Sequence, residues 1–350
     1  IGGCSQGPRW EGAASLLDGV FSGGLKPNAA TLTSSIMACA GKRWERATLL
    51  LQDVGVLRVR PTIVLYSAAI SMCEKGAQWR CALDLVEEAQ ECGLVPDTAM
   101  YNAAIGACDR GEQWMWALHL LDEMWSQRLE TSAATYGAAI SACERSLRSE
   151  EATELVAEMR RRQLEPNVIT FSAAVGARRS VGLWESALQL FDEMVAQGIR
   201  TDTRAYNTAL STCEEGKQWA RALWFLAEMP RRSITCDIVT YSAAISACEK
   251  GQQWTWALCL FGEVRRCGLV PDVITYSAAI SACEKGQQWE RAFSLMLAMQ
   301  LAGLEPDLSV YNAVISACEK GQYWERALEL CGHASASTVL CTSAIGACSR

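Results

Sequence analysis

The stretch that decides the fold is residues 273–307, which reads VITYSAAISACEKGQQWERAFSLMLAMQLAGLEPD. Residues 238–272 keep its segment YSAAISACEKGQQW unchanged, and another copy opens at Leu308. A fixed period in the range of about 20 to 50 residues is typical of solenoids and other repeat arrays. The sequence therefore predicts one short unit stacked many times, instead of the two or three separate domains that 350 residues would otherwise suggest.

The same 35-residue period can be followed through the whole chain, if each unit is numbered from the residue after its closing Pro-Asp or the equivalent pair. We predict a single solenoid domain over residues 1–350, with repeats at 29–62, 63–97, 98–132, 133–167, 168–202, 203–237, 238–272, 273–307 and 308–337. Residues 1–28 and 338–350 match parts of a repeat, so we expect the chain to be an internal fragment of a longer protein.

Each unit has the pattern of two helices. The first carries an apolar stripe at helical spacing, with Thr275 as the expected N-cap and Gly286 as the residue that ends it. In the preceding copy the second helix begins near Trp254, and Gly268 is expected to take the left-handed conformation after its end. The first-helix stripe is Tyr276, Ala279, Ile280 and Cys283. One such pair cannot bury its apolar faces, so the units must stack into an all-α repeat fold.

Most of the cysteines and large aromatic residues follow the repeat, which favours a role in packing. Ten of the 17 cysteines are Cys4, Cys39, Cys73, Cys108, Cys143, Cys213, Cys248, Cys283, Cys318 and Cys348, all at one repeat position. No C-x-x-C pair occurs, and the chain has only two histidines, so we expect no metal site, no cofactor and a reducing compartment. The recurring Trp at the seventeenth position and Tyr at the fourth are expected in the core between repeats, although base stacking is the alternative.

The overall charge and hydropathy set limits on the partners. The net charge of −7 gives no general attraction to nucleic acid. No apolar run approaches the roughly 20 residues that a membrane span needs, so we expect no membrane partner. Carboxylates follow the repeat on helix surfaces and no phosphate-binding loop or nucleophile constellation occurs, so neither an enzyme nor a small-molecule substrate is expected.

The unit resembles the pentatricopeptide repeat over essentially the whole chain. The resemblance lies in the opening TYS or TYN, a Lys near the turn, the segment LQLFDEM at 188–194 and the closing G-L-x-P-D, whereas Trp at the start of the second helix departs from the family pattern. The resemblance implies a right-handed α-solenoid superhelix that binds single-stranded RNA sequence-specifically, with one base per repeat. It further implies a role in RNA processing, stabilisation, splicing or translation in a chloroplast or mitochondrion, alongside other RNA-processing proteins.

In that family the fifth and last residues of a repeat read the base. The fifth residues here are Ser67, Asn102, Gly137, Ser172, Asn207, Ser242, Ser277 and Asn312. The paired last residues are Asp97, Ser132, Asn167, Asp202, Asp237, Asp272, Asp307 and, in the shortened last repeat, Ser337. Helix capping also explains the last residues, but it does not explain Ser or Asn inside a helix. The family's preferences predict 5′-G-(C/U)-A-G-U-G-G-(C/U)-3′ as the preferred RNA.

Two further positions complete the predicted site. The second residue of each repeat packs on base planes in the family, and the matching residues are Val64, Ile169, Arg204, Val239 and Ile274. The thirteenth residue lies near the RNA backbone, where Lys75, Arg110, Arg145, Lys250, Lys285 and Lys320 would form a positive stripe. A cation at the end of a helix is also stabilised by the helix dipole, so this stripe has a structural explanation too.

An alternative to RNA binding is a scaffold for protein–protein interaction, because stacked helices also present a surface to peptides. A peptide groove would be expected to offer larger anchors than Ser, Asn and Asp at the fifth and last positions. Some members of the family carry a deaminase domain, but its H-x-E and C-x-x-C signature is absent from this sequence.

Overall fold

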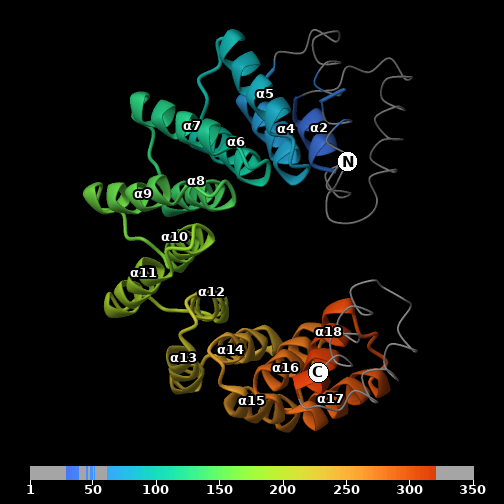
Figure 1. Ribbon diagram of the computed structural model, residues 1–350. Coiled ribbons are helices and arrows are strands. Elements are labelled where there is room, and N and C mark those ends of the chain that lie inside the picture. Colours follow the sequence, from blue (N-terminus) through green and yellow to red (C-terminus); the bar gives the residue numbers. More distant parts are fainter. Residues whose placement is uncertain (1–28, 39–44, 46–47, 50, 52–60, 321–350) are drawn as a thin grey trace. The chain divides into compact units, whose positions relative to one another are not determined.

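The computed structural model describes residues 29–38, 45, 48–49, 51 and 61–320 (Figure 1). Every regular element in this part of the chain is an α-helix, which confirms the all-α repeat fold. The chain divides into two compact units, Ile1–Val181 and Gly182–Arg350. The partial repeats at 1–28 and 338–350, most of repeat 29–62 and the second half of repeat 308–337 lie outside the described residues. The single uninterrupted solenoid stays a prediction.

The helices alternate between the first and second helix of a repeat. The first unit contains α2 (Ala29–Ala38), α4 (Ile63–Lys75), α5 (Trp79–Glu91), α6 (Thr98–Arg110), α7 (Trp114–Ser126), α8 (Ala133–Arg145), α9 (Ser149–Arg161) and α10 (Val168–Ser180). The second unit contains α11 (Trp184–Ala196), α12 (Thr203–Glu215), α13 (Trp219–Arg231), α14 (Ile238–Lys250), α15 (Trp254–Arg266), α16 (Val273–Lys285), α17 (Trp289–Leu301) and α18 (Leu308–Lys320).

Within each unit the first helices form a continuous layer. Helix α6 packs on α4 and α8, and α14 packs on α12 and α16 (Figure 1). Where both neighbours belong to the same unit, a second helix packs on the first helix of its own repeat and on that of the next, as α15 does on α14 and α16. A repeat is thus held by its neighbours, which is the arrangement expected of a helical-repeat fold.

The predicted apolar stripe is the core of this layer. Tyr276, Ala279, Ile280 and Cys283 are all buried. Burial also raises the pKa of the Cys108 thiol to about 12, so this cysteine behaves as a small apolar side chain at neutral pH. All cysteines in the described residues are free thiols, which agrees with the packing role inferred from their spacing.

The start of the first helix differs from the expectation. Asp272, and not Thr275, is the N-cap of α16, and its carboxylate accepts a hydrogen bond from the Thr275 backbone N–H at 2.8 Å. Thr275 lies three residues further on, with its side chain buried. A short acceptor side chain satisfies a helix N–H at the cap position, and Asp fulfils that role as well as Thr does.

The glycine between the two helices ends α16 as predicted, and it does so without taking the left-handed conformation. Gly286 has φ −83°, and the left-handed residue is the next one, Gln287, at φ +54°. A Cβ on Gly286 would lie 2.4 Å from the side chain of Trp254, so the glycine makes room for the tryptophan of the preceding repeat. Gly268, after α15, has φ +73° and takes the left-handed conformation as predicted.

No helix within the described residues combines the length and the apolar character needed to cross a lipid bilayer.

Candidate nucleic-acid interface

The fifth residue of a repeat lies beside the last residue of the same repeat. In repeat 203–237, the Nδ2 of Asn207 donates to Oδ1 of Asp237 at 3.3 Å. Asn207 is in α12, whereas Asp237 caps α14, the first helix of the next repeat. Because α12 and α14 pack side by side, one residue from each reaches the same place. The fold therefore joins these two predicted base-reading residues, although they are 30 residues apart in the sequence.

A threonine that the sequence reasoning did not single out joins the same cluster. It is the third residue of the following repeat, and Thr240 Oγ1 donates to Asn207 Oδ1 at 2.8 Å. Thr135 Oγ1 does the same to Asn102 Oδ1 at 2.6 Å, and it also lies 3.0 Å from the Oγ of Ser132. These threonines lie three residues after a capping residue, a spacing that is visible in the sequence.

In repeat 238–272 the same cluster forms around a serine. Thr275 Oγ1 lies 2.6 Å from the Oγ of Ser242 and donates to Asp272 Oδ1 at 2.6 Å. The Ser242 hydroxyl also donates to the Ile238 carbonyl at 2.8 Å. The hydroxyl group of the threonine thus connects the fifth and last residues of one repeat here as well.

Other fifth residues hold polar atoms that no neighbour satisfies. The Oγ of Ser172, the Oγ of Ser277 and the Oδ1 of Asn312 are buried and have no hydrogen-bond partner within the described residues. For Ser277, the third residue of the following repeat is Val310, which has no hydroxyl group where the other clusters have threonine. A buried polar atom without a partner costs about 1–3 kcal/mol, so such atoms mark places where a ligand can bind favourably.

The last residues of seven repeats are helix caps. Asp97, Ser132, Asn167, Asp202, Asp237, Asp272 and Asp307 each accept a hydrogen bond from a backbone N–H in the first turn of the next helix. This confirms the capping interpretation of these residues. A carboxylate has two oxygens, and the cap requires only one, so capping leaves an acceptor for a second partner.

Hydrogen bonding also determines the charge of Asp237. Burial favours its neutral form, but the backbone and side-chain hydrogen bonds from Thr240 and the one from Asn207 outweigh burial and lower the pKa of the Asp237 carboxyl. Asp237 is therefore an ionised acceptor at neutral pH.

The second residues of several repeats are exposed aliphatic side chains. Val64 is 60% exposed, Ile169 61%, Val239 53% and Ile274 65%. Arg204 occupies the same position and is also exposed. The Cγ2 of Ile169 lies 3.8 Å from the place where a Cβ on Gly137 would be, so this aliphatic residue borders the fifth residue of the preceding repeat. An exposed aliphatic side chain next to a polar cluster provides an apolar surface on which a flat ring can rest.

The predicted positive stripe is a row of ion pairs. Each of four cations pairs with the twelfth residue of the preceding repeat: Arg110 with Glu74 at 3.2 Å, Arg145 with Asp109 at 3.3 Å, Lys250 with Glu214 at 2.9 Å and Lys285 with Glu249 at 2.6 Å. Lys75 is exposed, and the side chain of Lys320 lies outside the described atoms. The pairing lowers the positive potential that these cations would present to a polyanion.

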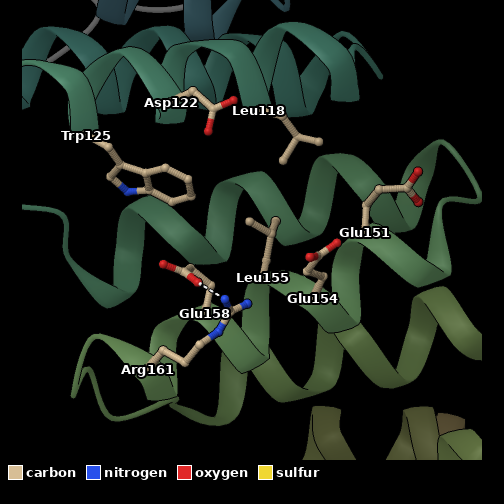
Figure 2. A pocket seen from close by; sticks show the side chains of 8 residues that line it. All are labelled: Leu118, Asp122, Trp125, Glu151, Glu154, Leu155, Glu158 and Arg161. Carbon is tan, nitrogen blue, oxygen red and sulfur yellow. Dashed lines mark ion pairs between the residues drawn. The ribbon is translucent and has the colours of Figure 1, made fainter.

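A pocket of about 310 Å³ lies between the second helices α7 and α9 (Figure 2). Its lining includes Trp125 and Leu155 together with Asp122, Glu151, Glu154 and Glu158. Arg161 and Arg162 pair with Glu158 and Arg148 pairs with Glu151, so Asp122 and Glu154 supply the negative charge of the lining that no ion pair within the described residues offsets. Because acidic side chains repel phosphate, this pocket is not suited to an RNA backbone. None of the described residues forms a cluster suited to hold a metal ion.

The fold and the site together define a helical-repeat protein with small polar clusters at three junctions between first helices, α6–α8, α12–α14 and α14–α16. Family models identify the repeat: the PPR repeat family matches residues 271–320, and the pentacotripeptide-repeat region of PRORP matches 58–202. The pentatricopeptide repeat domain matches 189–251, and the PPR repeat matches 239–269 and 309–333. The chain belongs to the pentatricopeptide repeat family.

Solved structures show the same fold. The pentatricopeptide repeat protein PPR10 from maize is 22% identical with a TM-score of 0.60, and the match covers 96% of this chain and 53% of PPR10. PPR10 in complex with an 18-nt psaJ RNA element is 18% identical with a TM-score of 0.59, covering 92% of this chain and 52% of that one. The chain thus spans about half the length of PPR10. No curated protein matches the sequence.

Proposed function

We propose that this chain binds single-stranded RNA sequence-specifically, with one base per repeat, and that it acts in the processing, stabilisation, splicing or translation of organellar transcripts. The observation that carries the proposal is the hydrogen bond between Asn207 and Asp237, the fifth and last residues of one repeat. The complex of PPR10 with an 18-nt RNA element supports the same class of ligand.

The chemistry of the cluster suits the edge of a base. The amide of Asn207 supplies N–H donors, and the ionised carboxylate of Asp237 supplies an acceptor, so the pair can form two hydrogen bonds with complementary groups of one base. Ser277 is only half-buried, so rotation of its side chain toward a base would give its unsatisfied Oγ a partner. Large apolar anchors, which a peptide groove requires, do not occur at the fifth and last positions.

The exposed second residues suit the plane of a base. Val239 and Ile274 begin successive first helices, α14 and α16, and each is more than half exposed. More than half of each aliphatic side chain is exposed, and covering it with a ring would remove apolar surface from water. This spacing of the exposed side chains supports a register of one base for each pair of neighbouring first helices.

The proposal predicts 5′-G-(C/U)-A-G-U-G-G-(C/U)-3′ as the preferred RNA. It also predicts that a substitution at a fifth residue changes the preferred base at one position. Asn207→Ser should shift the preference at the fifth base from U toward G, because Ser with Asp prefers G in this family. The measurement is selection from a random single-stranded RNA pool at low salt, followed by titration with octamers that differ at one base.

Thr208→Ser is the matched control, because Thr208 is the next residue of α12 and its hydroxyl donates to the Arg204 carbonyl within the helix. It should leave the preference at every base unchanged. Binding that is equal for all sequences, or preference for an unrelated octamer, would contradict the proposal and favour the protein-scaffold alternative.

The organellar part of the proposal rests on the family alone. Fractionation of source cells should place the full-length protein in chloroplasts or mitochondria, together with RNA-processing proteins that co-purify with it. A protein confined to the cytosol would contradict this part and leave RNA binding untouched.

A further inference from the structure

Two buried threonines lie against the asparagines that are proposed to read bases. Thr135 and Thr240 are the third residues of their repeats, with side chains that are at most 1% exposed. Each has its hydroxyl group within 2.8 Å of the amide oxygen of a fifth residue, Asn102 and Asn207 respectively. Because the side chains are buried, they are not themselves available to a ligand.

From this contact we infer that the third-position threonine is a positioning residue for base recognition, which turns the carboxamide of the preceding fifth residue so that its NH₂ group is presented to the base. The inference rests on the proposed RNA-binding function and adds to it a specificity-determining residue outside the fifth, last and second positions.

The hydrogen bonds at Thr135 determine which end of the Asn102 amide faces inward. The Thr135 hydroxyl accepts from the backbone N–H of Ser132 at 3.2 Å, so its own hydrogen is available to an acceptor. The 2.6 Å separation from Asn102 is typical of an O–H···O bond and short for N–H···O. The amide oxygen therefore faces Thr135, and both hydrogens of the NH₂ group remain for other partners.

Asn207 is held in the same orientation from two sides. Thr240 Oγ1 lies 2.8 Å from both Asn207 Oδ1 and Asp237 Oδ1, so its single hydrogen is shared between the two acceptors. The NH₂ group of Asn207 faces the carboxylate of Asp237, which can only accept. Asn102 has Ser132 in the corresponding place, and a hydroxyl group accepts or donates equally well. Orientation of Asn102 should therefore depend more on its threonine than orientation of Asn207 does.

Repeat 133–167 supplies a natural control within the first unit. Thr170 is buried and takes part in the same type of capping box as Thr135, with its hydroxyl 3.0 Å from the Asn167 N–H and 2.8 Å from the Asn167 carbonyl. The fifth residue next to it is Gly137, which has no side chain to orient; a Cβ there would be 3.7 Å from Thr170 Cγ2. Loss of the Thr170 hydroxyl thus disturbs the helix cap without affecting the carboxamide of a fifth residue.

The inference is tested by binding of the complete chain to four octamers that differ only at the second base, the one assigned to Asn102. Thr135→Val is isosteric, removes the hydroxyl, and leaves the amide free to present either end. We expect the preference for C or U over purines at this base to fall by about 3- to 10-fold, the discrimination that one hydrogen bond supplies. Thr135→Ser, which keeps the hydroxyl, should restore it.

Matched variants separate orientation from stability. The Thr170→Val protein should discriminate at the second base as the unsubstituted chain does. Its melting temperature should nevertheless fall as much as that of the Thr135→Val protein. Thr240→Val should reduce discrimination at the fifth base by less than Thr135→Val does at the second, because Asp237 still holds Asn207. In an Asn102→Gly background, Thr135→Val should have no further effect on the choice of base.

Unchanged discrimination at the second base in Thr135→Val, or an equal loss in Thr170→Val, would overturn the inference. So would a Thr135→Val effect that persists in the Asn102→Gly background, because the threonine would then act through another residue. Failure of the proposed function looks different, because the unsubstituted chain itself would then show no base preference.

Discussion

The tryptophan that opens many second helices limits the size of one residue in the next repeat. A Cβ on Gly111, Gly216 or Gly251 would lie within 2.6 Å of Trp79, Trp184 or Trp219 respectively. Where Ser149 replaces the tryptophan, Val181 replaces the glycine one repeat later. The two positions thus share one space between neighbouring repeats, and the second is small wherever the tryptophan is present in the described pairs: Gly, or Ser146 opposite Trp114.

This contact makes a prediction at the residue scale. Gly286→Ala should lower the free energy of unfolding by about 1–3 kcal/mol, because the added methyl group overlaps the ring of Trp254. The control is Gly262→Ala in α15, where a Cβ meets no atom within 4 Å. That substitution should stabilise the protein by about 0.5–1 kcal/mol, as replacing glycine within a helix does.

Urea unfolding measures both variants, and a double-mutant cycle identifies the cause. The cost of Gly286→Ala should largely disappear in a Trp254→Ser background, where the ring is absent. A Gly286→Ala protein as stable as the unsubstituted one would show that the tryptophan can move aside, contrary to this reasoning.

At the scale of the helix, the N-cap has two roles in one residue. Asp237 caps α14, the first helix of the next repeat, through the Thr240 N–H at 2.8 Å and also holds Asn207 of its own repeat at 3.3 Å. A capping residue that also contacts the preceding first helix connects local helix stability to the proposed reading of a base.

The lowered pKa of Asp237 predicts a pH dependence of stability. A carboxyl whose pKa is lower in the folded state stabilises the fold fully above its unfolded pKa of about 4, and this contribution is lost as the pH falls through the folded value. Asp237→Asn keeps a capping oxygen but removes the charge, and should cost about 0.3–1 kcal/mol at pH 7. The difference between the two proteins should shrink as the pH falls below about 4.

Urea unfolding of both proteins between pH 3 and pH 7 measures this difference, and effects of the other acidic groups cancel in the comparison. A difference that stays constant over the whole range would mean that the charge of Asp237 does not contribute.

The sequence was sufficient to predict the helices but not all of the contacts between them. The period placed the fifth and last residues of each repeat, and the structure brings Asn207 to Asp237. The role of Thr275 was not predictable in the same way, because Asp and Thr are both good capping residues and three positions separate them. Gly286 ends α16 as its sequence position predicted, but its contact with Trp254 of the preceding repeat was not predictable from that signal.

At the scale of the whole molecule, the ion pairs are another set of contacts between repeats that the sequence did not reveal. Lys285 is 36 residues from Glu249, a separation of one repeat plus one residue, so a stripe of cations was visible in the sequence and the pairing was not. The chain carries a net charge of −7, and these ion pairs neutralise four cations of the predicted stripe. Electrostatic attraction to RNA should therefore be weaker than six free cations at these positions would give.

Releasing one cation tests whether this row lies along the RNA. Glu249→Gln frees Lys285 from its 2.6 Å ion pair, so the slope of log affinity against log salt should become steeper by about 0.7, the value for one added phosphate contact on a single strand. Glu290→Gln in the first turn of α17 changes the net charge equally but lies outside the row, and should leave the slope unchanged. Filter binding of the preferred octamer between about 50 and 200 mM salt measures both. Equal slopes for the two variants would mean that Lys285 lies away from the phosphates and that its role is to join neighbouring repeats.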